Sequence, residues 1–480
     1  MPSTLQQTTS SLKWSALSQV SRILTQLLSL LILARLLPPS DFGLAAMAMI
    51  VVGFASLFRD FGTAAAIIQT VNPGFRLINS VFWLNVSLGV LMALAVGLLA
   101  PIIAVVFAEP RLTDVLWMFL LTFPIASLGT VHQALLEKES QFRPLALVES
   151  VASFAGLLGA VWAAWSGWGV FSLVLQTLLT AFFSTVGIWL ICQWRPIFQW
   201  DAKELLGLLR FSSNLVGFNL VNYFIRNADK MLIGRFLGAT DLGYYSIAYR
   251  LMLWPLQNIS SVVGRVLFPT FSQWQTDHER LANAYIRAMA AIVFITSPLL
   301  LGFFILRESF VIVALGDSWL PVANVLAWLI PVGLLQSIGT SVGTLYLATG
   351  RTDVMFKWGI GAGLLVIPAF VIGLQFGIVG VAAAYAVASL LLFYPGLAVP
   401  FRLVGLRVGD VLWRTMPSVV TAIAMALSIA VLAAAWPADA GNQLLRLMLL
   451  VLLGMVTYGG ISLFTQRALM KELFRSISNK

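Results

Sequence analysis

The chain has 480 residues, of which 60% are hydrophobic and 10% charged, and its formal net charge is +10. No soluble core could bury so much apolar surface, so a soluble globular fold is excluded and the chain belongs in a lipid bilayer. The lone cysteine, Cys192, excludes an intramolecular disulfide and a cysteine metal site.

Long apolar stretches predict the secondary structure. A helix that crosses a bilayer needs about 20 mostly apolar residues. Such continuous runs exclude membrane-spanning strands, which alternate apolar and polar residues over about ten positions. We therefore predict an all-α membrane protein with about 14 transmembrane helices. In chain order they cover residues 12–36, 42–69, 78–106, 113–136, 145–166, 168–192, 211–237, 242–270, 281–306, 319–349, 356–376, 377–396, 411–435 and 443–465.

The basic residues predict the orientation of these helices, because lysine and arginine gather in cytoplasmic loops. If the N-terminus is cytoplasmic, 18 of the 29 basic residues fall in cytoplasmic segments, 5 on the opposite side and 6 within the predicted helices. This asymmetry favours a multi-pass protein with both termini in the cytoplasm. It also accounts for the net charge, so we expect no nucleic-acid partner.

A short element occurs twice in the sequence. Residues 34–47 read ARLLPPSDFGLAAM and residues 234–247 read GRFLGATDLGYYSI, so four residues recur 200 positions later. Both copies follow an odd-numbered predicted helix, which means that the two halves enter the membrane in the same direction. The repeat predicts two parallel six-helix lobes, with Asp41 and Asp241 capping the helix that follows each copy.

These observations divide the chain into four parts. Residues 1–192 are the predicted first lobe and residues 211–396 the second, and residues 397–480 hold an appended helix pair and a cytoplasmic tail. Residues 193–210 read QWRPIFQWDAKELLGLLR, with an Asp-x-x-Glu capping pattern and two tryptophans suited to the headgroup level. We predict a short interfacial connecting helix here, with an ordinary polar connector as the alternative.

Charged residues inside the predicted helices are the candidate functional groups. An arginine or aspartate at mid-membrane costs about 3 kcal/mol and usually faces water or a partner. Arg226 and Lys230 lie four residues apart and share one helix face, with Asp229 beside them. A cationic cavity lining and an internally neutralised packing cluster are the two interpretations. Four asparagines in the same helix favour the cavity: Asn214, Asn219, Asn222 and Asn227.

Other charges in the predicted helices extend this candidate site. Three further arginines are candidates for lining the same cavity: Arg59, Arg22 and Arg250. The candidates for coupling transport to an ion are Asp60, Asp229 and His132. For His132, a packing role is the alternative to proton transfer.

Sequence motifs for nucleotide chemistry are missing. The sequence has no GxxxxGK[ST] loop, and its two Asp-Phe-Gly triplets lack the glycine-rich loop and the HRD segment of a kinase. No loop is long enough for a soluble catalytic domain. We therefore predict a transporter rather than an enzyme, without a cofactor or metal centre and with Na+ or H+ as candidate coupling ions.

Two segments resemble a known family. Residues 34–69, ARLLPPSDFGLAAMAMIVVGFASLFRDFGTAAAIIQ, and residues 227–270, NADKMLIGRFLGATDLGYYSIAYRLMLWPLQNISSVVGRVLFPT, are similar to the Wzx-type polysaccharide transporters. These flippases belong to the multidrug/oligosaccharidyl-lipid/polysaccharide exporter superfamily, and the likeness is strongest to its colanic acid exporter-like branch. The resemblance implies two lobes around a V-shaped central cavity.

The resemblance also implies a function, which is translocation of an undecaprenyl-pyrophosphate-linked oligosaccharide to the periplasmic leaflet of a bacterial inner membrane. Membrane lipids and polysaccharide polymerase machinery are the expected partners. Three competing functions remain, of which a purely structural assembly partner would not explain the buried basic residues. A cation-coupled multidrug exporter of the same superfamily usually carries acidic cavity residues, whereas this interior is net basic. A membrane glycosyltransferase or polymerase typically needs acidic catalytic residues or a large periplasmic loop, and neither is apparent.

Overall fold

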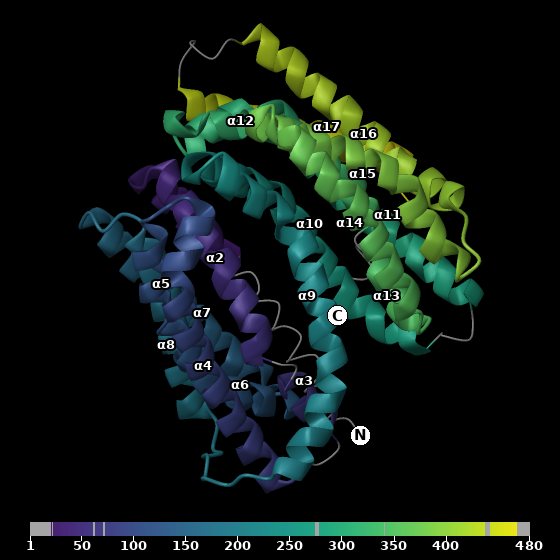
Figure 1. Ribbon diagram of the computed structural model, residues 1–480. Helices are drawn as coiled ribbons and strands as arrows, with labels where there is room; N and C mark the ends of the chain where they lie inside the picture. Colours follow the sequence, from purple (N-terminus) through teal and green to yellow (C-terminus); the bar gives the residue numbers. More distant parts are fainter. Residues whose placement is uncertain are drawn as a thin grey trace. The chain divides into compact units, whose positions relative to one another are not determined.

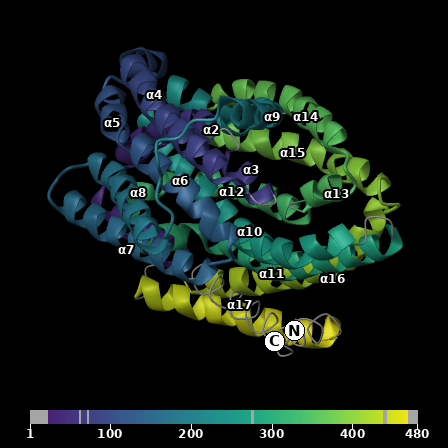
Figure 2. The same ribbon diagram turned by 90° about the horizontal axis from the view of Figure 1, so that it is seen from below.

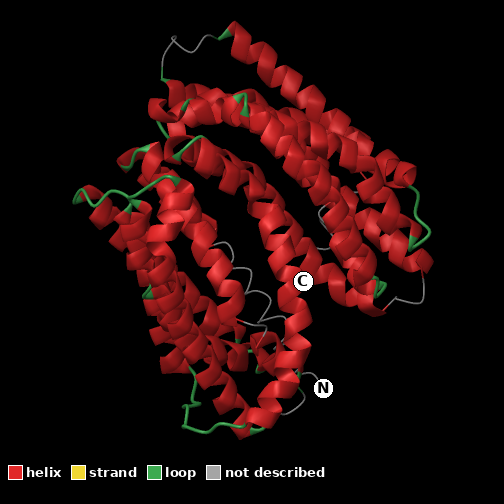
Figure 3. Ribbon diagram, viewed as in Figure 1, coloured by secondary structure: helices red, strands yellow, loops and turns green. Residues whose placement is uncertain are grey.

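The computed structural model describes residues 21, 23–60, 63–70, 73–273, 278–339, 341–436 and 442–467. Within these ranges the chain forms helices joined by short turns, and no strand occurs among them (Figure 3). The prediction of an all-α fold is confirmed. It follows from the physics of a bilayer, where a helix satisfies every backbone hydrogen bond within its own segment.

The chain divides into two compact units, Met1–Gly243 and Tyr244–Lys480 (Figure 1). The first unit holds α2 (Pro39–Asp60), α3 (Thr63–Gln69), α4 (Phe75–Phe107), α5 (Leu112–Phe119), α6 (Thr122–Lys138), α7 (Phe142–Trp165), α8 (Phe171–Ile191) and α9 (Ala202–Phe236). Helix α10 (Ala239–Gln273) begins at the end of the first unit and continues into the second. The second unit also holds α11 (His278–Ala314), η1 (Asp317–Trp319), α12 (Pro321–Gly339), α13 (Val342–Ala348), α14 (Thr352–Leu374), α15 (Gly377–Arg402), α16 (Val408–Ala435) and α17 (Gln443–Thr465).

Eleven stretches among the described residues are long and apolar enough to cross a membrane. Each coincides with one of the fourteen predicted helices. The other three predicted helices correspond to the shorter apolar helix Ile23–Leu36 and to α9 and α10, which are 35 residues long each. The chain is therefore a multi-pass membrane protein, and the count of fourteen stays a prediction.

The helices of the two units pair in the same pattern. In the first unit α4 packs against α6, α6 against α8, and α7 against α8. In the second unit α11 packs against α12, α12 against α15, and α14 against α15. The sequence repeat is thus accompanied by a repeated packing order within each unit.

The two copies of the repeated element touch each other through their glycines. A Cβ atom on Gly43 would lie 1.6 Å from the carbonyl oxygen of Ala239, and a Cβ on Gly243 would lie 2.0 Å from that of Pro39. Pro39 and Ala239 are equivalent residues of the repeat, so the contact is reciprocal. Only glycine permits backbones to approach this closely.

The expected caps of the repeat are not formed by its aspartates. Helices α2 and α10 begin at Pro39 and Ala239, so Asp41 and Asp241 lie in the first turn of each helix. Proline is favoured at the first helical position, which explains why α2 begins before Asp41. Asp41 instead lies 3.7 Å from Arg111 in an ion pair.

The connector after α8 differs from the short interfacial helix that we predicted over residues 193–210. Residues 192–201 are not helical, and residues from Ala202 onward belong to α9. Side chains of α4 hold the extended part. Asn79 accepts from the Ile197 N–H (2.7 Å), Ser80 accepts from the Asp201 N–H (2.8 Å), and Trp83 donates to the Ile197 carbonyl (3.1 Å). These bonds replace the backbone bonds that a helix would have formed.

Helices α16 and α17 form the appended pair at the end of the chain and pack against each other and against α11 (Figure 2). Arg446 of α17 joins all three helices. Its guanidinium donates to the carbonyls of Trp436 (2.8 Å) and Ala433 (3.0 Å) and to the hydroxyl of Ser309 on α11 (3.3 Å). The arginine therefore satisfies carbonyls at the C-terminus of α16 that have no helical donor.

Candidate functional site

One side of α9 carries a polar stripe, which we define as Asn219, Asn222, Arg226, Asp229 and Lys230. Asn219, Asn222, Arg226 and Lys230 follow one another at intervals of three or four and so share one face of the helix, and Asp229 lies at the edge of that face, three residues after Arg226. Asn222 and Arg226 are exposed, Asn219 and Lys230 are half-buried, and Asp229 is buried. An exposed arginine and asparagine on a membrane helix usually face water or a polar partner, and a hydrated face would supply this.

The charges of the stripe are unequal. Asp229 is only 3% exposed, and its Oδ1 atom accepts from the backbone N–H of Lys230 at 2.8 Å. The carboxylate thus lies at the buried edge of the stripe, whereas the Arg226 guanidinium lies at its exposed centre. With two cations and one carboxylate the stripe has a net positive charge, and its accessible part suits an anion.

Helix α9 is fixed against α2 by an aromatic contact. The Tyr223 hydroxyl donates to the Ile50 carbonyl at 2.5 Å, and it fills the space where a Cβ on Gly53 would lie 2.6 Å away. The rings of Phe54 and Phe224 lie 5.4 Å apart. These contacts set the rotation of α9 about its axis, and so determine which way the polar stripe faces.

Arg59 and Arg226 lie on these two packed helices but at different levels. The two helices run antiparallel. Gly43, near the start of α2, meets Ala239, which lies just after the end of α9, whereas Ile50, further along α2, meets Tyr223, which lies earlier in α9. From the contact between Phe54 and Phe224, five residues lead to Arg59 along α2 and two lead to Arg226 along α9. At a rise of 1.5 Å per residue the two arginines are therefore staggered by roughly 10 Å along the helix axes. The two arginines therefore lie at different levels along the helices and do not form one cluster.

The remaining charged candidates differ in how much of each the structure describes. Arg22 lies outside the described residues, as does the side chain of Asp60, the last residue of α2. Arg250 is exposed on α10, in the second unit. Arg59 is half-buried in the last turn of α2.

His132 lies in an aromatic cage inside the first unit. The side chain is fully buried, its ring stacks on Trp189 with 4.4 Å between centroids, and the rings of Trp194 and Phe82 lie edge-on at 4.9 and 5.9 Å. Its ring also lies against the backbone of Leu128 and of Trp194. An imidazole that carries protons needs a polar route, so these surroundings favour the packing interpretation.

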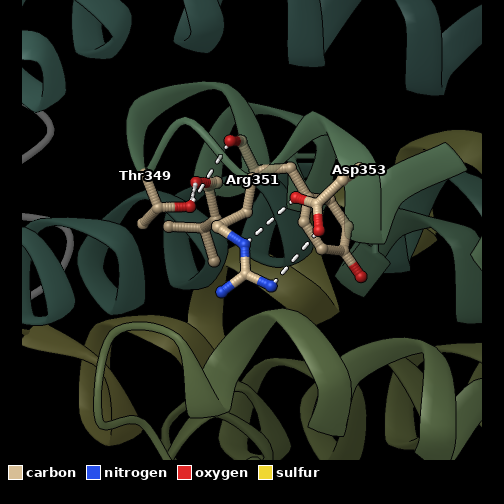
Figure 4. Close-up of polar contacts among 5 residues, drawn as sticks. Thr349, Arg351 and Asp353 are labelled. Carbon is tan, nitrogen blue, oxygen red and sulfur yellow. Dashed lines mark hydrogen bonds and ion pairs between the residues drawn. The ribbon is translucent and has the colours of Figure 1, made fainter.

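Arg351 illustrates a charged residue with a structural role (Figure 4). It follows Gly350, whose positive φ of 67° forms the turn between α13 and α14. Its guanidinium pairs in a bidentate manner with Asp353, with Nε to Oδ1 at 3.1 Å and Nη2 to Oδ2 at 3.3 Å. This carboxylate raises the pKa of Arg351. The pair is exposed and closes a turn. A cation that binds an anionic substrate is not expected to be paired with a carboxylate in this way.

No group of three or more His, Cys, Asp or Glu residues in the described part of the chain could hold a metal ion.

The aromatic contact between α2 and α9 was not anticipated from the sequence. Tyr223 and Phe224 look like ordinary apolar positions, and only their spacing of three and two residues from Arg226 links them to the stripe.

A profile of the family described as polysaccharide biosynthesis proteins matches residues 32–324, which is more than half of the chain. This chain belongs to the Wzx-type polysaccharide transporters. The transporter is 30% identical over 389 residues to the lipopolysaccharide biosynthesis protein WzxC of Escherichia coli K12, covering 80% of its own chain and 79% of WzxC. It is 28% identical over 468 residues to the succinoglycan biosynthesis transport protein ExoT of Rhizobium meliloti, covering 96% and 93% of the two chains.

The fold of the transporter is that of a solved flippase. The lipid II flippase MurJ, in an inward closed conformation, matches it with a TM-score of 0.76 and 15% identity, over 95% of this chain and 99% of MurJ. At that identity the likeness concerns the fold alone. Together with the family, it confirms the prediction of a flippase-class membrane transporter of polysaccharide biosynthesis and not an enzyme.

Proposed function

We propose that this transporter moves an undecaprenyl-pyrophosphate-linked oligosaccharide from the cytoplasmic to the periplasmic leaflet of a bacterial inner membrane. The observation that carries the proposal is the polar stripe of α9, with Arg226 exposed at its centre. A lipid-linked sugar consists of an apolar tail, an anionic diphosphate and a hydroxyl-rich glycan. A hydrated, positively charged helix face inside the membrane matches the last two and leaves the tail to the lipid.

The stripe offers a different chemistry to each part of the headgroup. The planar guanidinium of Arg226 can bind two phosphate oxygens at once, and the Lys230 ammonium adds a second charge one helical turn away. The amides of Asn219 and Asn222 both donate and accept hydrogen bonds, as sugar hydroxyls require. With the N-terminus of α9 toward the cytoplasm, the amides precede the cations along the direction of transport.

The stagger of the cations supports stepwise transfer. With this orientation Arg59 lies nearest the cytoplasm, Arg226 roughly 10 Å deeper and Lys230 about one turn further. A diphosphate that enters from the cytoplasmic leaflet would thus meet Arg59 first and then Arg226. Arg250 and Arg22 complete the proposed set of headgroup cations, and alternating access of two six-helix lobes would expose the site to each leaflet in turn.

The proposal includes the topology that the basic residues predict. It has fourteen helices and both termini in the cytoplasm, with lobes at residues 1–192 and 211–396, a connector at 193–210 and an appended pair within 397–480. Asp60 and Asp229 are the proposed groups for coupling to Na+ or H+. Membrane lipids and the polysaccharide polymerase machinery are the proposed partners.

Complementation tests the proposal. The full chain is expressed in a strain that lacks its own oligosaccharide flippase, and surface polysaccharide and cytoplasmic lipid-linked oligosaccharide are both measured. We expect the wild type to restore surface polysaccharide, and Arg226→Gln/Lys230→Gln to leave the lipid-linked precursor inside. Arg235→Gln is the matched control, because Arg235 is an exposed cation of the same helix that lies nine residues from Arg226 and so on the opposite face. Full rescue by the double variant would contradict the role of the stripe.

A further inference from the structure

A second candidate binding surface lies within the second unit, where aromatic and polar side chains of four helices meet. It consists of Tyr245 and Tyr249 of α10, Gln336 of α12, Phe370 of α14 and Tyr385 of α15. We call these five residues the tyrosine cluster. None of them belongs to the charged candidates, so the polar stripe of α9 does not account for the cluster.

Aromatic rings form the base of the tyrosine cluster. The ring of Tyr385 lies 5.5 Å from that of Phe370 and 6.4 Å from that of Tyr249, and Tyr249 stacks on Tyr245 at 6.1 Å. Tyr245 and Phe370 are buried, at 0% and 2% exposed, whereas Tyr249 and Tyr385 are half-buried. The two buried rings therefore support two tyrosines that keep accessible surface.

Gln336 adds a polar group with unused hydrogen-bonding capacity. Its Nε2 atom donates to the Tyr385 hydroxyl at 2.8 Å. A side-chain amide has two N–H donors and an oxygen that accepts, so the second N–H and the oxygen of Gln336 remain without a partner within the described residues. The side chain is half-buried, which leaves these atoms accessible to a ligand.

The surroundings of Gln336 suit a polar ligand better than lipid. Gln336 lies near the middle of the candidate membrane span Pro321–Ala348, where lipid would leave its amide unpaired at a cost. There is also room beside it. Gly339 lies one turn further along α12, and a Cβ atom there would meet no atom of the described residues within 4 Å.

The chemistry of the tyrosine cluster fits a sugar ring. A sugar presents C–H groups on its faces and hydroxyls at its edge, and a surface that combines aromatic rings with a few polar groups matches both. The Gln336 amide offers a donor and an acceptor, as neighbouring hydroxyls require. Because the cluster has no charged side chain, it does not suit the diphosphate, and the apolar tail would leave the amide unpaired.

A cation follows the cluster directly in the chain. Arg250 is exposed on α10, and neighbouring side chains leave a helix about 100° apart. Arg250 and Tyr249 can therefore contact adjoining parts of one ligand. In a lipid-linked oligosaccharide the first sugar is bonded to the diphosphate, so a sugar site is expected next to a phosphate-binding cation.

We propose that the tyrosine cluster is a subsite for a sugar ring of the lipid-linked oligosaccharide, held by the Gln336 amide and by the accessible surface of Tyr249 and Tyr385. The inference rests on the proposed function, and it adds residues of the second unit to the asparagines of the polar stripe. Its consequence is that these three side chains govern affinity for the glycan and leave affinity for the diphosphate unchanged.

Equilibrium binding to the purified full chain in detergent tests the inference with two probes. One is undecaprenyl pyrophosphate without a sugar, and the other is the lipid-linked oligosaccharide extracted from the cells that naturally make this chain. We expect the wild type to bind the sugar-bearing lipid more tightly. Gln336→Leu should weaken binding of the sugar-bearing lipid at least tenfold and binding of the sugar-free lipid less than twofold. Tyr249→Leu should act in the same direction.

Gln176→Leu is the matched control. Gln176 of α8 is half-buried and donates to the Ser29 hydroxyl at 2.7 Å, so the substitution removes the same kind of bond in the first unit. We expect it to keep the wild-type ratio of the two affinities. An equal loss for both lipids in Gln336→Leu, or unchanged binding of the sugar-bearing lipid, would overturn the inference.

The same measurement separates this inference from the proposed function. If the wild type bound both lipids equally, the sugar subsite would be refuted while the headgroup proposal stood. If the wild type bound neither lipid, the proposed function would fail, and the sugar subsite with it.

Discussion

The reciprocal contact between the two copies of the repeat makes a sharp prediction about Gly43 and Gly243. An alanine at Gly43 would place its Cβ 1.6 Å from the Ala239 carbonyl oxygen, and one at Gly243 would place it 2.0 Å from the Pro39 carbonyl oxygen. An ordinary contact between such atoms is about 3.2 Å or more, so the two backbones must separate by roughly 1 to 2 Å. Overpacking of this kind costs about 1 to 3 kcal/mol, and here no side chain can rotate away to relieve it.

We therefore expect Gly43→Ala and Gly243→Ala each to lower the free energy of unfolding by about 2 to 3 kcal/mol. The double variant should cost much less than twice as much, because the first alanine already separates the backbones. Denaturant unfolding of the purified protein in detergent measures all three.

The control for this prediction is Gly359→Ala. A Cβ at Gly359, within α14, meets no atom within 4 Å. We expect this variant to be neutral or to gain about 0.5 to 1 kcal/mol from the lower entropy of the unfolded chain. Additive losses in the double variant, or wild-type stability in Gly43→Ala, would refute the argument that the two turns pack backbone to backbone.

Three further predictions concern the connector, the appended pair and the cysteine. Asn79→Ala leaves the Ile197 N–H without its 2.7 Å acceptor and should cost about 1 to 3 kcal/mol in denaturant unfolding; an unchanged midpoint would contradict the holding role of α4. Arg446→Met removes three hydrogen bonds and should lower the melting temperature, with Arg446→Lys intermediate; equal stability of the two variants would argue against a role for the three-way hydrogen bonding of the guanidinium. Burial raises the pKa of the Cys192 thiol, so at pH 7 to 8 fewer molecules carry the reactive thiolate and native labelling by maleimide should be much slower than after denaturation. Labelling should accelerate as the pH rises, and complete native labelling within minutes at pH 7 would show that the thiol is accessible.

Hydropathy was enough to locate the membrane helices of this chain. Spans such as 145–166 and 443–465 coincide with α7 and α17 because an apolar run of that length has no other way to satisfy its backbone in lipid. The repeat around Gly43 was equally visible, since it rests on identical residues. Its structural meaning was not, because the reciprocal contact depends on which backbones meet.

The polar residues show where sequence reasoning ended. The spacing of Arg226 and Lys230 predicted a shared face, but their different exposure depends on how Tyr223 and Phe224 fix α9 against α2. The capping pattern at Asp201 agrees with the start of α9 at Ala202, but the residues before Asp201 are not helical because Asn79 and Ser80 of α4 bind their backbone. Local propensity is weak when side chains distant in sequence can satisfy the same N–H groups.

Reconstitution tests the central claim, that the stripe of α9 carries the headgroup across the membrane, most directly. The purified transporter is placed in liposomes with a labelled lipid-linked oligosaccharide in one leaflet, and arrival in the other leaflet is measured by a glycosidase that cannot cross the membrane. We predict transfer by the wild type and by Arg235→Gln, and at least a tenfold slower transfer by Arg226→Gln with the protein still folded. Equal transfer rates for Arg226→Gln and the wild type would contradict the account.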